Sequence, residues 1–560
     1  MASLFVAGLS LFALTSRVVS LDSEIVFNGT CPDYVVYAGE HHGPYSEGAY
    51  NLSFQRPPLP CRTWNSTEVE DTVERMRDII TDPDLYRVFQ NSFPNTLDTA
   101  IRWHGVASNN SEEELTFIIT GDINAMWLRD SANQLQSYLP LLTANSSIDS
   151  LASLFRGCIN LQSRYINTSP HCNAFQPPEE AGLGVSENPY SQTDEVTPPY
   201  SNQSVFECKY ELDSISAFLQ ISHQYYITTS DLKFFDSFQW VDTVRTILNT
   251  AYDLMNGTYA PDGQVLEQPY TFERETTSGT ETLPNEGRGN PVRGGTGLIR
   301  SAFRPSDDSS IYQLFIPANM MFSYFLSTTA DIMAQLSHPD APTLAPEMTS
   351  LAAAIRAAID AAGLTLAPSS TSYSNLTQIY AFEVDGFGSA NVMDDANIPS
   401  LLAAPFFGYD VADPRYQATR AHVLSEVNSY FMRGPVISAV GGPHQSFGMA
   451  WPMASIVRII TAGTHPSPST PLRPDGNGNG NGSAAPAAAQ LDAAAKAEIR
   501  QELRQLVAST DGYGLMHESV NSWNESDWTR QWFSWANGLF GQMVLGLEGT
   551  GLLEESYQPE

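Results

Sequence analysis

The sequence predicts an all-α protein: an α/α toroid, in which paired helices form two rings, preceded by an irregular N-terminal arm. Segments with apolar residues three and four positions apart recur along the chain, whereas strand-like alternation is scarce and short. The segments between these helices are long and polar, with Gly, Pro, Asp and Asn, which is typical of loops that carry chemistry. A helical-repeat solenoid is the alternative, and the lack of an internal sequence repeat weighs against it.

The helical period appears first near residue 69 and last near residue 547. Within residues 213–226, for example, Ile215, Phe218 and Leu219 fall on one face of a helix. The predicted helices cover residues 69–80, 130–141, 148–165, 213–226, 236–255, 318–335, 348–362, 414–431, 449–462, 489–508 and 531–547.

The chain divides into four parts by composition. Residues 1–20 resemble a targeting segment, and residues 21–75, rich in Pro and Gly, are expected to form an irregular arm packed on the main body. Residues 76–550 form one large, mostly helical domain. Within it, the low-complexity stretch 463–490 contains Gly-Asn and Pro-Ser runs that cannot bury enough apolar surface to order themselves. We expect it to be a disordered surface insertion that joins two helices.

The N-terminus predicts a protein of the secretory pathway, either secreted or lumenal in the ER, Golgi or vacuole. The run MASLFVAGLSLFALTSRVVS is apolar and ends in small residues, as in a signal peptide cleaved near Ser20. Because it lacks a basic start, a short uncleaved anchor is the alternative; no other stretch reaches the ~20 apolar residues of a membrane span. Sequons for N-glycosylation agree with this route. They begin at Asn28, Asn51, Asn65, Asn109, Asn145, Asn167, Asn202, Asn256, Asn375, Asn481 and Asn524.

Charge and cysteine content exclude several classes of function. With 62 acidic and 28 basic residues the net charge is −34, and such a surface repels nucleic acid and favours solubility. The five cysteines all lie in the first 210 residues, so a disulfide clip near the N-terminus is plausible and at least one thiol is unpaired within the chain. No cysteine or histidine set has zinc-ligand spacing, so we predict neither a metal nor a cofactor.

Two polar segments carry adjacent charged side chains. Residues 120–135 place Asp122, Arg129 and Asp130 at the start of a helical pattern, where an Arg–Asp pair that caps the helix is the structural explanation. Asp307 and Asp308 precede an apolar run, where two carboxylates are costly unless one is paired or protonated. A protonated carboxyl can act as a general acid, and capping of a helix by Asp is the alternative.

Four further segments complete the candidate loops. In residues 209–214 we expect Asp213 to cap a helix and Glu211 to be a solvated charge. Residues 272–292 are dense in charge and could line the rim of a cleft. The remaining two segments, 381–401 with 442–453 and 514–541, contribute Glu383, Asp385, Asp394, Asp395, His444, Trp451, His517, Glu518, Asp527 and Arg530. The helical spacing of Trp528, Trp532 and Trp535 predicts that these three side chains pack in the interior.

The loops together supply carboxylates, arginines, amides and aromatic rings. This inventory suits a neutral, hydroxyl-rich ligand, because carboxylates accept hydrogen bonds from hydroxyls while Arg and Asn donate them. The sequence has no Gly-rich phosphate loop and no G-x-S-x-G nucleophile elbow, so phosphoryl transfer and the usual serine hydrolase chemistry have no support.

Several motifs resemble glycoside hydrolase family 125, the exo-α-1,6-mannosidases, and in particular its longer fungal members. They span about residues 95–548 in order: TGDINAMWLRDS, FRPSDD with IPANM, EVDGFG with MDDANIPSLL, GPHQSFGMAWPM, and MHES followed by TRQWFSWANGLFG. The resemblance implies an (α/α)6 barrel as the catalytic domain, a pocket for one terminal mannose of a glycan, an inverting mechanism and independence from metals. The alternatives are a glucoamylase-like toroid enzyme and a catalytically silent glycan-binding protein.

The resemblance also implies roles for individual residues. The general acid is an Asp that we place at Asp308, with Asp307 the close alternative and Asp213 in reserve, and the general base is Glu518. In an inverting enzyme the two carboxyl carbons lie roughly 6.5–9.5 Å apart, which leaves room for the attacking water. Sugar contacts or supporting roles are expected for Asp122, Arg129, Asp130, Arg304, Asn319, Glu383, His444 and Arg530.

Overall fold

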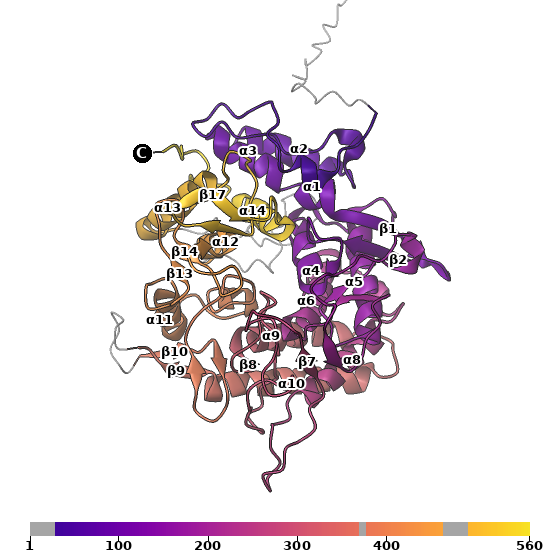
Figure 1. Ribbon diagram of the computed structural model, residues 1–560. Helices are drawn as coiled ribbons and strands as arrows, with labels where there is room; N and C mark the ends of the chain where they lie inside the picture. Colours follow the sequence, from indigo (N-terminus) through magenta and orange to yellow (C-terminus); the bar gives the residue numbers. More distant parts are fainter. Residues whose placement is uncertain (1–28, 369–376, 463–490, 560) are drawn as a thin grey trace, which may run out of the picture.

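The computed structural model describes residues 29–368, 377–462 and 491–559, and helices make up most of its regular structure (Figure 1). The predicted leader (1–20) and the low-complexity stretch (463–490) lie outside the described residues. The helices are α1 (Tyr34–Tyr37), α2 (Thr67–Arg77), α3 (Pro83–Ser92), α4 (Leu128–Gln136), α5 (Leu151–Thr168), α6 (Leu212–Thr229), α7 (Leu232–Phe235), α8 (Trp240–Asp253), α9 (Ile316–Met333), α10 (Ala341–Ala362), α11 (Pro414–Val423), α12 (Pro452–Ile460), α13 (Ala493–Ala508) and α14 (Ser534–Gly546).

Every predicted helical segment contains a helix, with ends that shift by several residues in places. Helix α10 begins at Ala341, earlier than the predicted residue 348, and α11 ends at Val423, before the predicted 431. Helix α3 was not predicted, although its start carries a recognisable signal. Asp82 accepts hydrogen bonds from the first N–H groups of α3, and Pro83 occupies the first helical position, where its missing N–H costs nothing.

The helices pack in two sets around the centre of the molecule. Helices α14, α4, α6 and α9 pack against one another in that succession, and α12 packs on α14. A second set covers them: α3 lies on α14, α5 on α6, α10 on α9 and α13 on α12. Figure 1 shows the first set nearer the middle and the second set around it. Since every residue of α4 is buried, including Arg129 and Asp130, the polar side chains of this helix must find partners inside the protein.

Short antiparallel strands lead into several of the central helices. Among the described residues they form only two- and three-stranded sheets, so no sheet closes on itself. The strands are β1 (Ile101–Ala107), β2 (Asn110–Ile118), β3 (Met126–Trp127), β4 (Ala174–Phe175), β5 (Glu195–Thr197), β6 (Val205–Glu207), β7 (Thr271–Glu273), β8 (Leu314–Phe315), β9 (Leu364–Leu366), β10 (Gln378–Tyr380), β11 (Glu383–Val384), β12 (Ala390–Asn391), β13 (Phe431–Met432), β14 (Ala439–Val440), β15 (Met449–Ala450), β16 (Ser519–Asn521) and β17 (Asn524–Thr529). Strand β3 precedes α4 and β15 precedes α12, so the paired strands fix where each helix begins.

The N-terminal arm is fastened to the helical body by main-chain and side-chain contacts. The Ser53 N–H donates to the Gly512 carbonyl (2.8 Å), and the Thr63 N–H donates to the Asp98 carbonyl (3.0 Å). Arg56, which is buried, pairs with the Asp98 carboxylate at 2.6 Å. None of the helices in the described residues is both long and apolar enough to cross a membrane.

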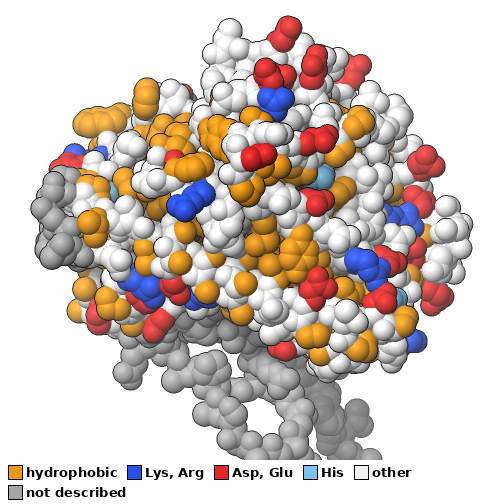
Figure 2. All heavy atoms as spheres, turned by 90° about the horizontal axis from the view of Figure 1, so that it is seen from below, with side chains coloured by type: hydrophobic (Ala, Val, Ile, Leu, Met, Phe, Trp, Pro, Cys, Tyr) orange, Lys and Arg blue, Asp and Glu red, His pale blue; other side chains and the backbone are white. Residues whose placement is uncertain are grey.

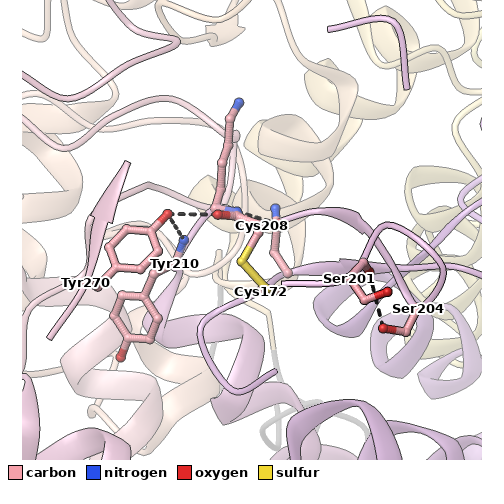
Figure 3. Close-up of a disulfide and its surroundings, with 8 residues drawn as sticks. Cys172, Ser201, Ser204, Cys208, Tyr210 and Tyr270 are labelled. Atoms are coloured by element: carbon pink, nitrogen blue, oxygen red, sulfur yellow. Dashed lines mark hydrogen bonds between the residues drawn. A yellow bond between two sulfur atoms is a disulfide. The ribbon is translucent and has the colours of Figure 1, made fainter. Parts of the chain in front are cut away.

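Two disulfides form, and one thiol stays free, as the odd count requires. Cys31–Cys61 closes the predicted N-terminal clip, while the Cys158 thiol is buried inside α5. Cys172–Cys208 joins the segments that carry β4 and β6 (Figure 3). The Tyr270 hydroxyl donates to the Cys208 carbonyl (2.8 Å) and thus anchors the second of these segments. The residues next to this disulfide therefore have a fixed position.

The surface agrees with the acidic composition. Figure 2 shows one face on which acidic side chains are spread among scattered apolar ones, with basic groups between them. Such a mixed surface of net negative charge favours solubility rather than binding to nucleic acid.

Candidate active site

A pocket of about 250 Å³ opens where α4, α12 and α14 begin. Its volume is below the ~300–1,000 Å³ of sites for drug-sized ligands, so it suits one small polar ligand. Its walls combine charged, amide and aromatic side chains. They are Thr120, Asp122, Ile123, Trp127, Arg129, Asp130, Pro305, Ser306, Asp307, Asn397, His444, Gln445, Trp451, Glu518, Thr529, Arg530 and Phe533.

Glu518 is one of two carboxylates in the pocket wall that the sequence indicates as candidate catalytic residues. It is 7% exposed, and its Oε2 accepts hydrogen bonds from Gln445 Nε2 (2.8 Å) and Thr529 Oγ1 (3.1 Å). Arg530 approaches the other oxygen, Oε1, at 3.5 Å, and its Nε donates to Asp122 Oδ1 at 2.7 Å. These partners hold the carboxylate in place at the pocket wall, where it can accept a proton from a water molecule.

Asp307 is the second carboxylate, and its side chain is 23% exposed. Its Oδ1 accepts hydrogen bonds from Trp127 Nε1 (3.4 Å) and Asn173 Nδ2 (3.2 Å). Lys209 Nζ donates to the main-chain carbonyl of Asp307 at 2.8 Å. Burial favours a high pKa for Asp307, but Lys209 and then Arg129 outweigh it and lower the pKa below its usual value.

The two adjacent aspartates differ in where their side chains lie, and Asp307 is the one in the pocket wall. The Asp308 side chain is 0% exposed and does not belong to the pocket wall. The main chain turns tightly here, because the Arg304 N–H donates to the Asp308 carbonyl (2.8 Å) and the φ of Asp307 is +65°. This left-handed conformation, which is uncommon for a residue other than glycine, sends the two side chains to different places.

His444 bridges Asp308 and the pocket. Its Nδ1 lies 3.5 Å from Asp308 Oδ1. Burial favours a lower pKa, but the charges of Asp308, Glu518 and Asp307 outweigh it and raise the pKa of His444 to about 10. Ligand atoms of Glu281, Asp308 and His444 lie within 4.8 Å of one another, which is compatible with a metal by distance alone. The 3.5 Å separation of His444 Nδ1 and Asp308 Oδ1 is that of an ion pair, and we interpret the group as an ion-pair cluster.

Arg129 gathers a set of buried carboxyls behind the pocket. Its Nη1 donates to Glu211 Oε2 (2.6 Å) and Asp213 Oδ2 (3.0 Å), and its Nη2 lies 3.3 Å from Asp130 Oδ2. Burial, opposed by Arg129, raises the pKa of Asp130 to about 6. The prediction that Glu211 is a solvated charge is wrong, since it is 1% exposed. The prediction that Asp213 caps a helix is also wrong, because its side chain turns to Arg129 from the first turn of α6.

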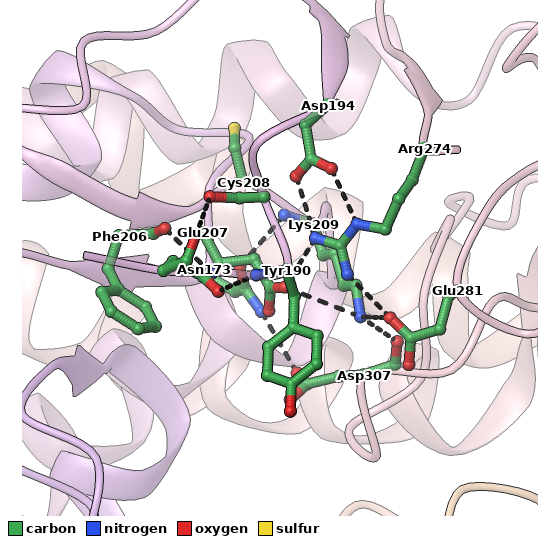
Figure 4. A network of polar contacts seen from close by, with 12 residues as sticks. Asn173, Tyr190, Asp194, Phe206, Glu207, Cys208, Lys209, Arg274, Glu281 and Asp307 are labelled. Carbon is green, nitrogen blue, oxygen red and sulfur yellow. Dashed lines mark hydrogen bonds and ion pairs between the residues drawn. The ribbon is translucent and has the colours of Figure 1, made fainter. Parts of the chain in front are cut away.

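A second network supports the loop between β6 and α6 (Figure 4). Lys209 Nζ lies 3.1 Å from Glu281 Oε2, and Arg274 pairs with Asp194 (2.7 Å) and Glu207 (2.9 Å). Glu281 and Arg274 belong to the segment 272–292 that the sequence suggested as a cleft rim, and they lie beside the site rather than in its wall. The network holds Lys209 against Asp307.

Eight residues were expected to contact the sugar or support the site, and five of them line the pocket: Asp122, Arg129, Asp130, His444 and Arg530. The other three are buried outside the pocket wall. Arg304 pairs with Glu383 at 2.6 Å. The Asn319 side-chain amide accepts a hydrogen bond from the Ile299 N–H and donates one to the Ile299 carbonyl, each at 2.9 Å. These three residues stabilise the loops that present Asp307 and do not reach the pocket.

Some residues of the site were not predicted. Asn173 and Lys209 directly follow Cys172 and Cys208, which form a disulfide. Their position next to these cysteines is the one sequence signal that could have identified them as site residues. Gln445 lies in the GPHQSFG motif beside His444, and its contact with Glu518 depends on a segment more than 70 residues later. Among the tryptophans, Trp532 and Trp535 are buried as expected. Trp528 is partly buried and packs against the core, where it stacks on His517 at 4.3 Å, but it lies on β17 and not on a helix.

Residues 82–545 match the family described as metal-independent alpha-mannosidase (GH125). The chain belongs to this family. Asp307, Glu518 and the whole pocket wall lie within the matched range, whereas the arm before α3 lies outside it. The pocket therefore belongs to the GH125 part of the chain.

Two relatives illustrate how far this GH125 chain resembles known proteins. It is 41% identical over 520 residues to the "Meiotically up-regulated gene 157 protein" of Schizosaccharomyces pombe, and the match covers 92% of each chain. A solved metal-independent α-mannosidase of Streptococcus pneumoniae, in a non-productive complex with α-1,6-mannobiose, is 30% identical with a TM-score of 0.68. That match covers 88% of this chain and 99% of the bacterial one.

Proposed function

We propose that the protein is an exo-acting α-1,6-mannosidase that removes terminal, non-reducing α-mannose from glycans with inversion of configuration. The observation that carries the proposal is that Asp307 and Glu518 line the same small pocket of a GH125 chain. The rest of the wall offers hydrogen-bond partners for hydroxyls, such as Asp122 and Arg530, and aromatic surfaces such as Trp451. A pocket of about 250 Å³ has room for one terminal sugar, which supports an exo mode of action.

We propose further that the helices form an (α/α)6 barrel. Helices α4, α6, α9, α12 and α14 would supply five inner members, and the short 3-10 helix Ala404–Phe407, which packs on α9, would take the sixth inner place. Six helices, α3, α5, α8, α10, α11 and α13, would form the outer ring. The succession of packing neighbours within each set supports this arrangement.

In the proposed mechanism Asp307 is the general acid and Glu518 the general base. The bond between C1 of the terminal mannose and the departing O6 breaks, and its electron pair stays on O6, which takes the proton of Asp307. A water molecule attacks C1 from the other face and gives a proton to Glu518. Positive charge develops on the ring in the transition state, and the carboxylates of Asp122 and Asp130 favour it electrostatically.

A panel of linkage-defined substrates tests the proposed function. We expect release of mannose from α-1,6-mannobiose and little from the 1,2- and 1,3-linked isomers, because the 6-linked leaving alcohol extends away from the ring on its own methylene. The S. pneumoniae protein was crystallised with the 1,6-linked disaccharide. Turnover of α-glucosides instead would indicate a glucoamylase-like enzyme, and binding of mannobiose without turnover would indicate a silent glycan-binding protein.

The activity is expected to survive removal of metals. Neither Asp307 nor Glu518 needs a metal for the proton transfers of two-carboxylate chemistry. After exhaustive treatment with EDTA, turnover of α-1,6-mannobiose should remain within about twofold of the untreated protein, because no step of two-carboxylate chemistry uses a metal. Loss of turnover that Ca²⁺ or Zn²⁺ restores would show that the Glu281, Asp308 and His444 cluster binds a functional ion.

We also propose that the protein passes through the secretory pathway as a glycoprotein. Seven sequon asparagines are exposed in the described residues: Asn51, Asn65, Asn109, Asn145, Asn202, Asn256 and Asn524. Asn167 differs, because its amide donates to Thr243 Oγ1 (2.9 Å) and accepts from Thr246 Oγ1 (2.9 Å). Peptide mapping of protein from a eukaryotic host should find glycans on exposed sequons and a bare Asn167. A protein without any glycan would contradict the proposed route.

A further inference from the structure

An amide group joins Asp307 to a buried glutamate. Asn173 Nδ2 lies 3.2 Å from Asp307 Oδ1 and 3.3 Å from Glu211 Oε1. The Asn173 side-chain oxygen accepts a hydrogen bond from the main-chain N–H of Lys209 at 3.0 Å. This contact orients the Asn173 amide so that its nitrogen faces both carboxyl groups. A single nitrogen thus contacts both oxygens, and a side-chain hydrogen bond also links the Glu211 and Asp307 carboxyl groups, so the two are neighbours.

Too few positive charges face this pair for all the nearby carboxyls to ionise. Arg129 contacts Glu211 (2.6 Å), Asp213 (3.0 Å) and Asp130 (3.3 Å), and it approaches Asp307 at 3.8 Å. Full ionisation would thus place four carboxylates around one guanidinium. Buried like charges at this spacing disfavour the ionised form, so the group retains a proton.

The next cation, Lys209, is shared among several acceptors. It donates to the Asp307 carbonyl at 2.8 Å and lies 3.1 Å from Glu281 and 3.8 Å from Glu207. It therefore offsets only part of the negative charge around Asp307. His444, from the loop before β15, adds a further positive charge on the pocket side of Asp307.

Glu211 is the member of this group best placed to hold the proton next to Asp307. Burial raises the pKa of Glu211 well above its usual value; Arg129 opposes the rise and Asp307 adds to it. The pKa of Asp307 shifts in the opposite direction. Burial favours a higher pKa, but Lys209 and Arg129 outweigh this effect and lower the pKa below its usual value. Asp213 and Asp130 are also buried, but neither shares a hydrogen-bond donor with Asp307 among the contacts of the described residues.

We propose that Glu211 and Asp307 hold one proton between them and that Glu211 is the group from which the general acid receives its proton. This inference rests on the proposed function, in which Asp307 acts as the acid. The Glu211 O–H gives its proton to the Asp307 carboxylate, and Asp307 passes it to O6 as the C1–O6 bond breaks. Glu211 does not line the pocket, so it acts through Asp307 as a positioning and proton-holding residue. After turnover, exchange with solvent restores the shared proton and removes the one that Glu518 received.

The pair predicts a specific change in the pH profile. In the wild-type protein the alkaline limb of kcat/KM reports loss of the shared proton. Glu211→Gln removes the negative neighbour that favours protonation of Asp307, whereas Lys209, Arg129 and His444 remain. The pKa of Asp307 should then fall, and the alkaline limb on α-1,6-mannobiose should move to lower pH by roughly one to two units, the usual effect of one adjacent charge.

The test compares Glu211→Gln with the wild-type protein on α-1,6-mannobiose and on an aryl α-mannoside with a good leaving group. At a pH above the shifted limb, activity on the disaccharide should fall at least about tenfold, the usual scale for an impaired general acid. The aryl substrate, which leaves without the proton, should lose much less. Glu114→Gln is the matched control: it breaks a carboxylate–arginine pair with Arg156 (2.5 Å) away from the pocket and should leave the limb in place.

An unmoved alkaline limb in Glu211→Gln, or an equal loss on both substrates, would overturn the inference and leave Glu211 a structural residue. If Glu211→Gln does not fold, Glu211→Asp keeps a carboxyl at a greater distance. Its limb should move in the same direction by a smaller amount, and an unchanged limb would count against the proposal. Failure of the proposed function is distinguishable, because Asp307→Asn would then lose activity on both substrates alike or on neither.

Discussion

Asp307→Asn will lower kcat/KM on α-1,6-mannobiose by about 10²–10⁴-fold, the usual contribution of a general acid. The leaving alcohol of the disaccharide is poor and needs a proton, and Asn cannot supply one. An aryl α-mannoside or an α-mannosyl fluoride leaves without help, so its turnover should fall far less. The ratio of the two losses, rather than either loss alone, identifies the acid.

The neighbouring aspartate supplies the control. Asp308→Asn removes the carboxylate that lies 3.5 Å from His444, so it should alter the pocket and weaken both substrates to a similar degree. If Asp308→Asn shows the substrate-dependent loss and Asp307→Asn does not, Asp308 is the acid despite its burial. If neither variant shows the substrate-dependent loss and Asp213→Asn does, the acid is Asp213, in the first turn of α6.

Glu518→Gln should lower turnover of both substrates by a similar factor, again about 10²–10⁴-fold. Water must lose a proton to attack C1 whatever group departs, so a good leaving group does not compensate for a missing base. Gln keeps the size of the side chain and can still contact Thr529 and Gln445, which limits the structural change. Turnover of the aryl substrate at the wild-type rate would exclude Glu518 as the base.

Asp527→Ala is the matched control for Glu518→Gln. Asp527 is an exposed carboxylate on the neighbouring strand β17, where it accepts a hydrogen bond from Asn521 at 2.8 Å. It does not line the pocket, so its loss should leave kcat/KM within about twofold, as is usual for surface substitutions away from a site.

The sequence predicts the helices well, because their apolar spacing is a local property. Helix α6 buries Ile215, Phe218 and Leu219 on the face that the pattern indicated. Among the helices longer than one turn, α3 is the exception, since its start depends on Asp82 and Pro83 rather than on a long apolar stripe. The motifs also bring Asp122, Glu518 and Arg530 to one pocket, although several hundred residues separate Asp122 from the other two.

What the sequence could not predict depends on contacts made over long distances in the chain. Glu211 looks solvated in KYELDS, but the fold brings it two partners from earlier in the chain, Arg129 and Asn173, which donate hydrogen bonds to its carboxyl group. Which of Asp307 and Asp308 reaches the pocket wall depends on the main-chain turn with φ of +65° at Asp307, which no residue pattern specified. Arg304, Asn319 and Glu383 have the chemistry of sugar contacts, and their burial shows that they support the loops instead.

The central claim, inverting hydrolysis by Asp307 and Glu518, is tested most directly by NMR of the first product released from α-1,6-mannobiose. The account predicts that β-mannose appears first and then equilibrates with the α-anomer, because water attacks C1 from the face opposite to the departing O6. If α-mannose appears first, the reaction retains configuration, one of the two carboxylates is a nucleophile, and the mechanism proposed for this pocket is wrong.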